Sequence, residues 1–170
     1  MNATAHQRLR RFALLTVIST FCFLVPNVAR TQSVGDTAVF TDFTTFDAGT
    51  IRAVDLKDRP VLLYFWAGWC PTCNREMPTL MKIYAKYKAK GFEVLAVNFR
   101  EEPANALAFY KRHGLAFPGG LIDDTYKANY PNIRGTPTWF LIDRQGIIRK
   151  KVVGDEDIRW ELEKALAPLL

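Results

Sequence analysis

The amino-acid sequence predicts an α/β fold in which a central mixed sheet is flanked by helices, with a β-hairpin added on the N-terminal side. Two apolar runs, 61–65 and 92–99, are short and bulky, as is typical of strands covered on both faces. Between them apolar residues recur every three or four positions, which predicts an amphipathic helix from Cys70 to about Lys90. A helical crossover of this kind makes the two strands parallel.

The hairpin is expected just before the first of these strands. Segments 42–46 and 51–53 are joined by a turn that contains Gly49, and together they have the pattern of two short paired strands. Further along, Pro78 lies inside the first helix and predicts a kink there, because proline lacks an N–H group and its ring crowds the preceding turn.

A second helix is predicted after the second strand. Pro103 suits the first turn of a helix, and the helix is expected to end near Gly114 with His113 in its last turn. The apolar spacing predicts that Leu107 and Tyr110 face inward.

The C-terminal third adds shorter elements: an extended piece at 119–122, a helix at 125–129, strands at 138–142 and 147–153, and a last helix. The Asp123–Asp124 pair is predicted to cap the short helix rather than to bind a metal, and Asp155 is predicted to cap the last one. Lys150 and Lys151 indicate that the final strand lies at a sheet edge, where charge opposes aggregation.

The N-terminal residues indicate export. Three arginines precede an apolar run at 12–25, which matches the charged and hydrophobic regions of an export signal. This run is shorter than the roughly 20 residues that a membrane span needs. Residues 1–29 are therefore expected to form either a cleaved signal peptide or an N-terminal membrane anchor. Polar, small residues at 30–38 predict a linker, and 39–170 is expected to be one domain.

Charge and cysteine content narrow the class of protein. Four arginines at or before residue 30 supply four of the six net positive charges of the 170-residue chain, so no nucleic-acid partner is expected. His113 is the only histidine after the leader, and no metal site is predicted. The domain is large enough to fold without a structural disulfide, and we expect a monomer. Its two cysteines, Cys70 and Cys73, make one pair.

The cysteine pair lies where the first strand gives way to a helix, in the segment Trp-Ala-Gly-Trp-Cys-Pro-Thr-Cys at 66–73. A helix N-terminus presents free N–H groups and partial positive charge, so it lowers the pKa of a thiol there. Cys70 is the expected nucleophile, and Pro71 fits the first turn. Cys73 falls on the same face, where it can close a disulfide or attack a mixed disulfide at Cys70.

Two further residues are expected to serve this pair. Glu76 follows Cys73 by three positions, so its carboxylate could accept the Cys73 proton when that sulfur becomes a nucleophile. Trp69 lies beside Cys70 and is expected to shield one side of its sulfur, whereas Trp66 is a candidate for the core.

The Trp-Cys-Pro-Thr-Cys motif after an apolar strand, together with Gly-Thr-Pro-Thr-Trp-Phe-Leu-Ile-Asp at 135–143, resembles the thioredoxin superfamily. More narrowly, the sequence from Val39 onward is similar to the membrane-tethered periplasmic reductases of the TlpA, ResA and CcmG type. The resemblance implies a thioredoxin-like fold in which Pro137 is a cis-proline facing the cysteines. It also implies a substrate-binding surface formed by Trp69, Pro71, Thr72, Thr136 and Pro137.

One position departs from thioredoxin itself. Thioredoxin has a buried aspartate six residues before the first cysteine, and this chain has Tyr64 there. The departure leaves Glu76, which matches an acid that many members carry, as the expected proton acceptor.

The resemblance further implies a role: a dithiol reductant of protein disulfides outside the cytoplasm, as in cytochrome c maturation. The implied clients are apocytochrome c or other periplasmic thiol proteins. A membrane thiol carrier of the CcdA or DsbD type would reduce the Cys70–Cys73 disulfide again, and no cofactor is expected.

Two other functions remain open from the sequence. A disulfide-forming oxidase of the same fold is one, because the Pro-Thr dipeptide between the cysteines does not by itself set the reduction potential. A copper-binding metallochaperone is the other, because two thiolates also suit a soft metal. That function would want a third soft ligand, and His113 is expected on a different helix.

Overall fold

The computed structural model describes residues 32–170. Its centre is a five-stranded sheet with the strand order β5-β4-β3-β6-β7. The strands are β3 (Val61–Trp66), β4 (Glu93–Asn98), β5 (Gly119–Leu121), β6 (Thr138–Ile142) and β7 (Ile148–Val153). Strands β3, β4 and β5 run parallel, whereas β6 is antiparallel to β3 and β7 is antiparallel to β6. The predicted mixed sheet is confirmed, and β7 lies at its edge as expected.

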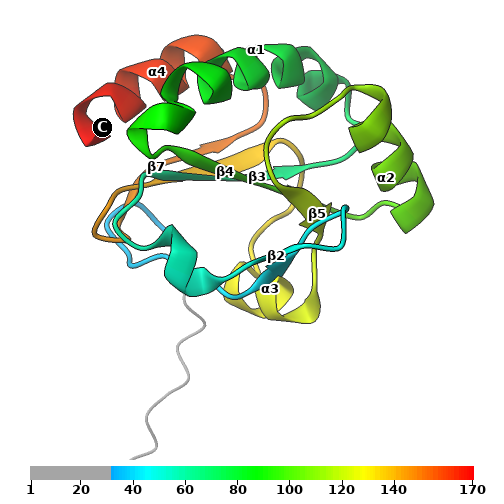
Figure 1. Cartoon of the computed structure of the whole chain (residues 1–170), viewed down its shortest axis with the longest axis horizontal. Coiled ribbons are helices and arrows are strands. Elements are labelled where there is room, and N and C mark those ends of the chain that lie inside the picture. Colours follow the sequence, from blue (N-terminus) through cyan, green and yellow to red (C-terminus); the bar gives the residue numbers. More distant parts are fainter. Residues whose placement is uncertain (1–31) are drawn as a thin grey trace, which may run out of the picture.

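Helices cover both faces of this sheet (Figure 1). The helices are α1 (Pro71–Tyr87), α2 (Pro103–Arg112), α3 (Asp124–Asn129) and α4 (Ile158–Leu166), with short 3-10 turns η1 (Ala53–Leu56), η2 (Lys88–Lys90) and η3 (Ala167–Leu169). Helices α1 and α4 lie together on one face, and α3 lies on the other with the hairpin of β1 (Phe43–Thr44) and β2 (Thr50–Ile51). Helix α1 continues through Pro78 as one element.

The two layers explain why the central strands are apolar at every position. Alternate residues of β3 point to opposite faces. Leu62, Tyr64 and Trp66 join the core under α1 and α4, while Leu63 and Phe65 join the core under α3 and the hairpin. Every residue of β3 and β4 is buried as a result.

The N-terminal hairpin is confirmed as an antiparallel pair, and it rests on β5. The Phe46 N–H group donates to the Gly119 carbonyl at 2.8 Å. A Cβ atom at Gly120 would lie 2.1 Å from the Thr44 carbonyl oxygen, so only glycine allows the hairpin this close to the sheet.

Two predictions about helices are wrong in detail. Ala106 and Phe109 are the buried residues of α2. Tyr110 is half-buried and packs against the core as predicted, whereas Leu107 is half-buried and belongs to neither core cluster. Asp157, not Asp155, caps α4, because its side chain accepts the N–H groups of the first turn. By contrast, Asp123 caps α3 as predicted, accepting from the Tyr126 N–H group at 2.7 Å.

The described part of the expected linker lies against the edge strand β7. Thr37 forms a β-bridge with Ile147, and the Gly35 N–H group donates to the Ile148 carbonyl at 2.9 Å. The expected leader, 1–29, lies outside the described residues. Within 32–170, none of the helices has the length and apolar character that crossing a membrane requires.

Candidate active site

The cysteine pair sits in a tightly fixed turn between β3 and α1. Cys70 occupies the N-cap position of α1, and its sulfur accepts the Cys73 N–H group at 3.3 Å. Before it, the Gly68 N–H group donates to the Glu101 carboxylate at 2.8 Å, and that carboxylate also accepts from the Asn98 side chain at 2.7 Å. A Cβ atom at Gly68 would meet Glu101 at 2.7 Å. The turn is therefore held from β4 and the segment that follows it.

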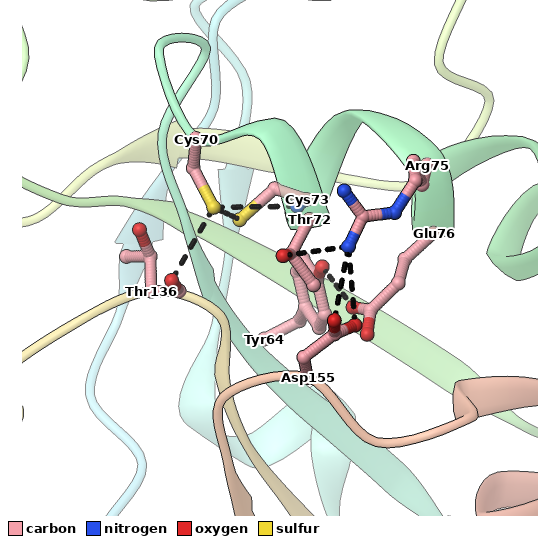
Figure 2. A network of polar contacts seen from close by, with 8 residues as sticks. All are labelled: Tyr64, Cys70, Thr72, Cys73, Arg75, Glu76, Thr136 and Asp155. Atoms are coloured by element: carbon pink, nitrogen blue, oxygen red, sulfur yellow. Dashed lines mark hydrogen bonds and ion pairs between the residues drawn. The ribbon is translucent and has the colours of Figure 1, made fainter.

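Both cysteines are free, and their sulfur atoms lie 2.6 Å apart (Figure 2). Cys73 is fully buried, whereas Cys70 is 3% exposed and lies next to the exposed residues Trp69 and Pro71. Burial, followed by the hydrogen bond with Cys70, raises the pKa of the Cys73 thiol above its usual value. Cys73 thus needs a base before it can act as a nucleophile.

The loop that contains Pro137 comes from the far end of the chain to meet Cys70. The Thr136–Pro137 peptide bond is cis, as the resemblance implies. The Cys70 thiol donates to the Thr136 carbonyl at 3.3 Å (Figure 2). Thr136 is half-buried and Pro137 is buried, so the backbone of Thr136 is the part of this loop that borders Cys70.

The surface around the cysteines, here called the rim, includes the apolar side chain of Trp69 and the polar side chain of Thr72. Trp69 is 58% exposed, and its indole N–H group donates to the Arg100 carbonyl at 3.2 Å. Arg100 in turn lines a cavity of about 500 Å³, whose walls also include Leu121 and Tyr130. On another side, Thr72 is half-buried and accepts a hydrogen bond from Arg75 at 3.0 Å.

Glu76 is buried below the cysteine pair and has one recorded hydrogen bond, from the Tyr64 hydroxyl to its Oε2 atom at 2.6 Å (Figure 2). Burial raises the pKa of Glu76 to about 7, although the Tyr64 hydrogen bond acts in the opposite direction. Arg75, the nearest residue along the helix, instead pairs with Asp155 at 3.1 Å. Glu76 therefore has a pKa near neutral pH and no salt bridge among the described residues, although the charge of Arg75 acts to lower that pKa.

The structure brings together all the predicted site residues around one junction of β3, α1 and the Thr136 loop. Two contributors were missed. The sequence identifies Tyr64 only as the residue that replaces an aspartate, and it does not predict the hydrogen bond to Glu76. The position of Tyr64, six residues before Cys70, is the sequence feature that could have indicated a place in the site. Glu101 carried no signal in the sequence, because it reaches Gly68 from a loop 33 residues away.

The described residues offer no metal centre. Among residues 32–170, no group of three or more His, Cys, Asp and Glu side chains is arranged to hold a metal ion. His113 lies at the C-terminal end of α2, where its ring stacks on Phe109 with 4.1 Å between the ring centroids.

A cysteine pair at a helix N-terminus, facing a cis-proline on a mixed five-stranded sheet, defines a thiol-disulfide oxidoreductase of thioredoxin-like fold. The family model described as Redoxin matches residues 33–168. The chain therefore belongs to the Redoxin family, and within the thioredoxin superfamily it is a protein of the TlpA, ResA and CcmG type.

Individual relatives agree with this assignment. The chain is 36% identical over 134 residues to thiol-disulfide oxidoreductase ResA of Geobacillus thermodenitrificans, covering 77% of each chain. It is also 36% identical over 125 residues to ResA of Halalkalibacterium halodurans, covering 71% of this chain and 68% of the relative. Among solved structures, a Chlorobium tepidum chain assigned as thiol:disulfide interchange protein DsbE is 30% identical with a TM-score of 0.73, covering 82% of this chain and 99% of that one.

Proposed function

We propose that this thiol-disulfide oxidoreductase is a dithiol reductant of protein disulfides that works outside the cytoplasm. The observation that carries the proposal is the unequal placement of the two cysteines. Cys70 borders the exposed rim and the Thr136 backbone, whereas Cys73 is sealed beneath it beside Tyr64 and Glu76. A client disulfide can therefore reach Cys70 first, and Cys73 is reserved for the second step.

The reaction then has two exchanges. The Cys70 thiolate attacks a client disulfide, forms a mixed disulfide and releases one client sulfur as a thiolate. Cys73 next loses its proton, with Glu76 as the final acceptor, and attacks the Cys70 sulfur. The client leaves fully reduced, and a Cys70–Cys73 disulfide remains. Two electrons pass from the cysteine pair to the client, so the chemistry requires no cofactor.

The residues around the cysteine pair are the proposed client-binding surface. We infer that Trp69, Pro71 and Thr72 contact the client on the helix side, and that Thr136 and Pro137 contact it on the loop side. The Thr136 carbonyl accepts from the Cys70 thiol in the reduced protein. Once Cys70 is ionised or bound to a client, that carbonyl is free to accept an N–H group from an extended client backbone. The cavity beside Arg100 has room for a client side chain.

The clients and the electron donor are inferred from the resemblance to ResA-type proteins. Apocytochrome c and other extracytoplasmic thiol proteins are the proposed clients. A membrane thiol carrier of the CcdA or DsbD type is the proposed donor, because an oxidising compartment does not by itself regenerate a dithiol. Residues 1–29, as signal or anchor, would deliver the 39–170 domain to that compartment.

Trapping tests the assignment of the two cysteines. Cys70→Ser should abolish reduction of a protein disulfide, while Cys73→Ser should accumulate mixed disulfides with clients, because the resolving sulfur is gone. Non-reducing electrophoresis separates these species. If mixed disulfides accumulate with Cys70→Ser and not with Cys73→Ser, the two roles are reversed.

The reduction potential tests the direction of electron flow. We would equilibrate the full-length protein in graded thiol buffers and follow tryptophan fluorescence, since Trp69 lies next to Cys70. A potential near or below that of thioredoxin, about −270 mV, supports a reductant. A value near that of the strong oxidant DsbA, about −120 mV, would make the protein a disulfide donor instead.

A further inference from the structure

Tyr64 lies between the resolving cysteine and the buried glutamate. It projects from β3 into the core under α1 and is fully buried. Its hydroxyl donates to Glu76 Oε2 at 2.6 Å. The hydroxyl also lies near Cys73. The pKa of Tyr64 is raised well above its ordinary value, first by burial and then by the nearby Cys73 and Glu76 side chains. The Tyr64 hydroxyl, which comes from β3, thus lies near both the Cys73 sulfur and the Glu76 carboxylate of α1.

The Glu76 carboxylate has a free acceptor. Within the described chain, 32–170, the Oε1 atom of Glu76 is buried and has no hydrogen-bond partner. The charged groups around Glu76 are Arg75 on α1 and two aspartates, Asp155 and Asp157, before α4. Arg75 forms its salt bridge with Asp155 at 3.1 Å, and its charge lowers the pKa of Glu76 less than burial raises it. Because its pKa is about 7, the Glu76 carboxylate can accept a proton near neutral pH.

A second tyrosine–glutamate pair in the same core shows what a purely structural arrangement looks like. The Tyr84 hydroxyl donates to Glu93 Oε1 at 2.8 Å, a bond much like that of Tyr64. However, Glu93 also pairs with Arg59 at 3.0 Å and accepts the Val94 N–H group at 3.1 Å. Both oxygens of Glu93 are therefore occupied, whereas one oxygen of Glu76, Oε1, has no hydrogen-bond partner among the described residues.

We propose that Tyr64 is a proton relay in the resolving step, carrying the proton of the Cys73 thiol to Glu76. The inference rests on the proposed function, because it requires Cys73 to be the resolving cysteine. It uses the position of the Tyr64 hydroxyl, which is hydrogen-bonded to Glu76 and lies near Cys73.

The Cys73 S–H bond breaks and its proton passes to the Tyr64 oxygen, while the Tyr64 O–H proton passes to Glu76 Oε2. The Cys73 sulfur then bonds to the Cys70 sulfur, and the bond between Cys70 and the client sulfur breaks. The client sulfur leaves with the electron pair of that bond and takes a proton from water. Tyr64 ends as it began, and Glu76 holds the proton removed from Cys73.

Stopped-flow kinetics can separate the two sulfur steps. Reduced full-length protein is mixed with an aromatic disulfide that releases a coloured thiolate at each exchange, so the first phase reports attack by Cys70 and the second reports resolution by Cys73. Tyr64→Phe, which removes only the hydroxyl, should slow the second phase about 10- to 100-fold near pH 7 and leave the first phase unchanged. Tyr84→Phe is the matched control and should change neither phase.

The pH profile distinguishes a relay from a loss of packing. In the wild-type protein the second phase should rise through about pH 7, where Glu76 becomes able to accept a proton. This inflection should vanish in Tyr64→Phe and in Glu76→Gln. The double variant should be no slower than the slower single variant, because both remove the same route. An unchanged second phase and inflection in Tyr64→Phe would overturn the relay.

Two controls keep the outcomes distinct. If Tyr64→Phe fails to fold, 3-fluorotyrosine at position 64 preserves the shape and acidifies the hydroxyl; an unchanged second phase would then overturn the relay. If the wild-type protein shows no second phase although Cys70 reacts, the proposed resolving role of Cys73 fails, and the relay fails with it. A wild-type second phase that is insensitive to Tyr64 refutes the relay alone.

Discussion

The core between the sheet and α1 contains two buried glutamates, each of which accepts a hydrogen bond from a tyrosine, yet the two have different surroundings. Glu93, at the start of β4, is bound by Tyr84, Arg59 and its neighbour's backbone. Glu76, on α1, is bound by Tyr64 alone among the described residues. The difference lies in the salt bridge: Arg59 pairs with Glu93, whereas Arg75 pairs with Asp155 and not with Glu76.

This comparison separates a stabilising role from a reactive one. A buried carboxylate that has an arginine and occupied oxygens contributes to stability, and removing it leaves other groups unpaired. A buried carboxylate without a cation is costly to ionise, and its pKa rises into the range where it can exchange protons near neutrality. Glu76, one turn after Cys73, is a carboxylate of this second kind.

The largest expected difference is in stability near pH 8. Glu93→Gln should lower the free energy of unfolding by about 2 kcal/mol, because it leaves the half-exposed Arg59 without its charge partner. Glu76→Gln should leave that free energy unchanged or raise it, because an ionised buried carboxylate is replaced by a neutral group. Urea denaturation of the reduced proteins measures both values. A larger loss for Glu76→Gln than for Glu93→Gln would contradict the comparison.

The pH dependence of stability should single out Glu76. Its pKa is about 7 in the folded protein against a usual value of 4.5, so the unfolded chain ionises first as the pH rises. The stability from protonated Glu76 is fully present below about pH 4.5 and is lost as the pH rises through about 7. Wild type and Glu93→Gln should share this decline. A decline of equal size in Glu76→Gln would assign it to another group.

The smallest expected effects come from the tyrosine hydroxyls. Tyr64→Phe and Tyr84→Phe should each cost about 1 kcal/mol of unfolding free energy, the net value of one hydrogen bond. They should differ in the titration of Glu76. Because the Tyr64 hydrogen bond lowers the pKa of Glu76, Tyr64→Phe should raise that pKa further, whereas Tyr84→Phe should leave it in place. The carboxyl carbon shift of Glu76, followed by NMR against pH, would measure this; equal titrations in both variants would count against it.

Much of the fold followed from local pattern. The apolar runs that became β3 and β4, the amphipathic spacing of α1 and the cap at Asp123 all depend on residues within a few positions of one another. Prediction failed where two nearby residues could do the same task. Asp155 and Asp157 are both acids before α4, and Asp157 is the cap because the helix begins at Ile158, directly after it, while Asp155 pairs with Arg75, 80 residues earlier in the chain.

The sequence by itself determined the cysteine pair, its place at the start of a helix and the presence of Glu76 one turn further on, because covalent spacing and helical geometry are local properties. Only the tertiary structure decided what surrounds that glutamate. The packing of β3 under α1 brings the Tyr64 hydroxyl to Glu76 across 12 residues of chain, and the loop before α4 supplies Asp155 as the salt-bridge partner of Arg75. The proton affinity of a buried carboxyl depends on such neighbours, which spacing along the chain does not specify.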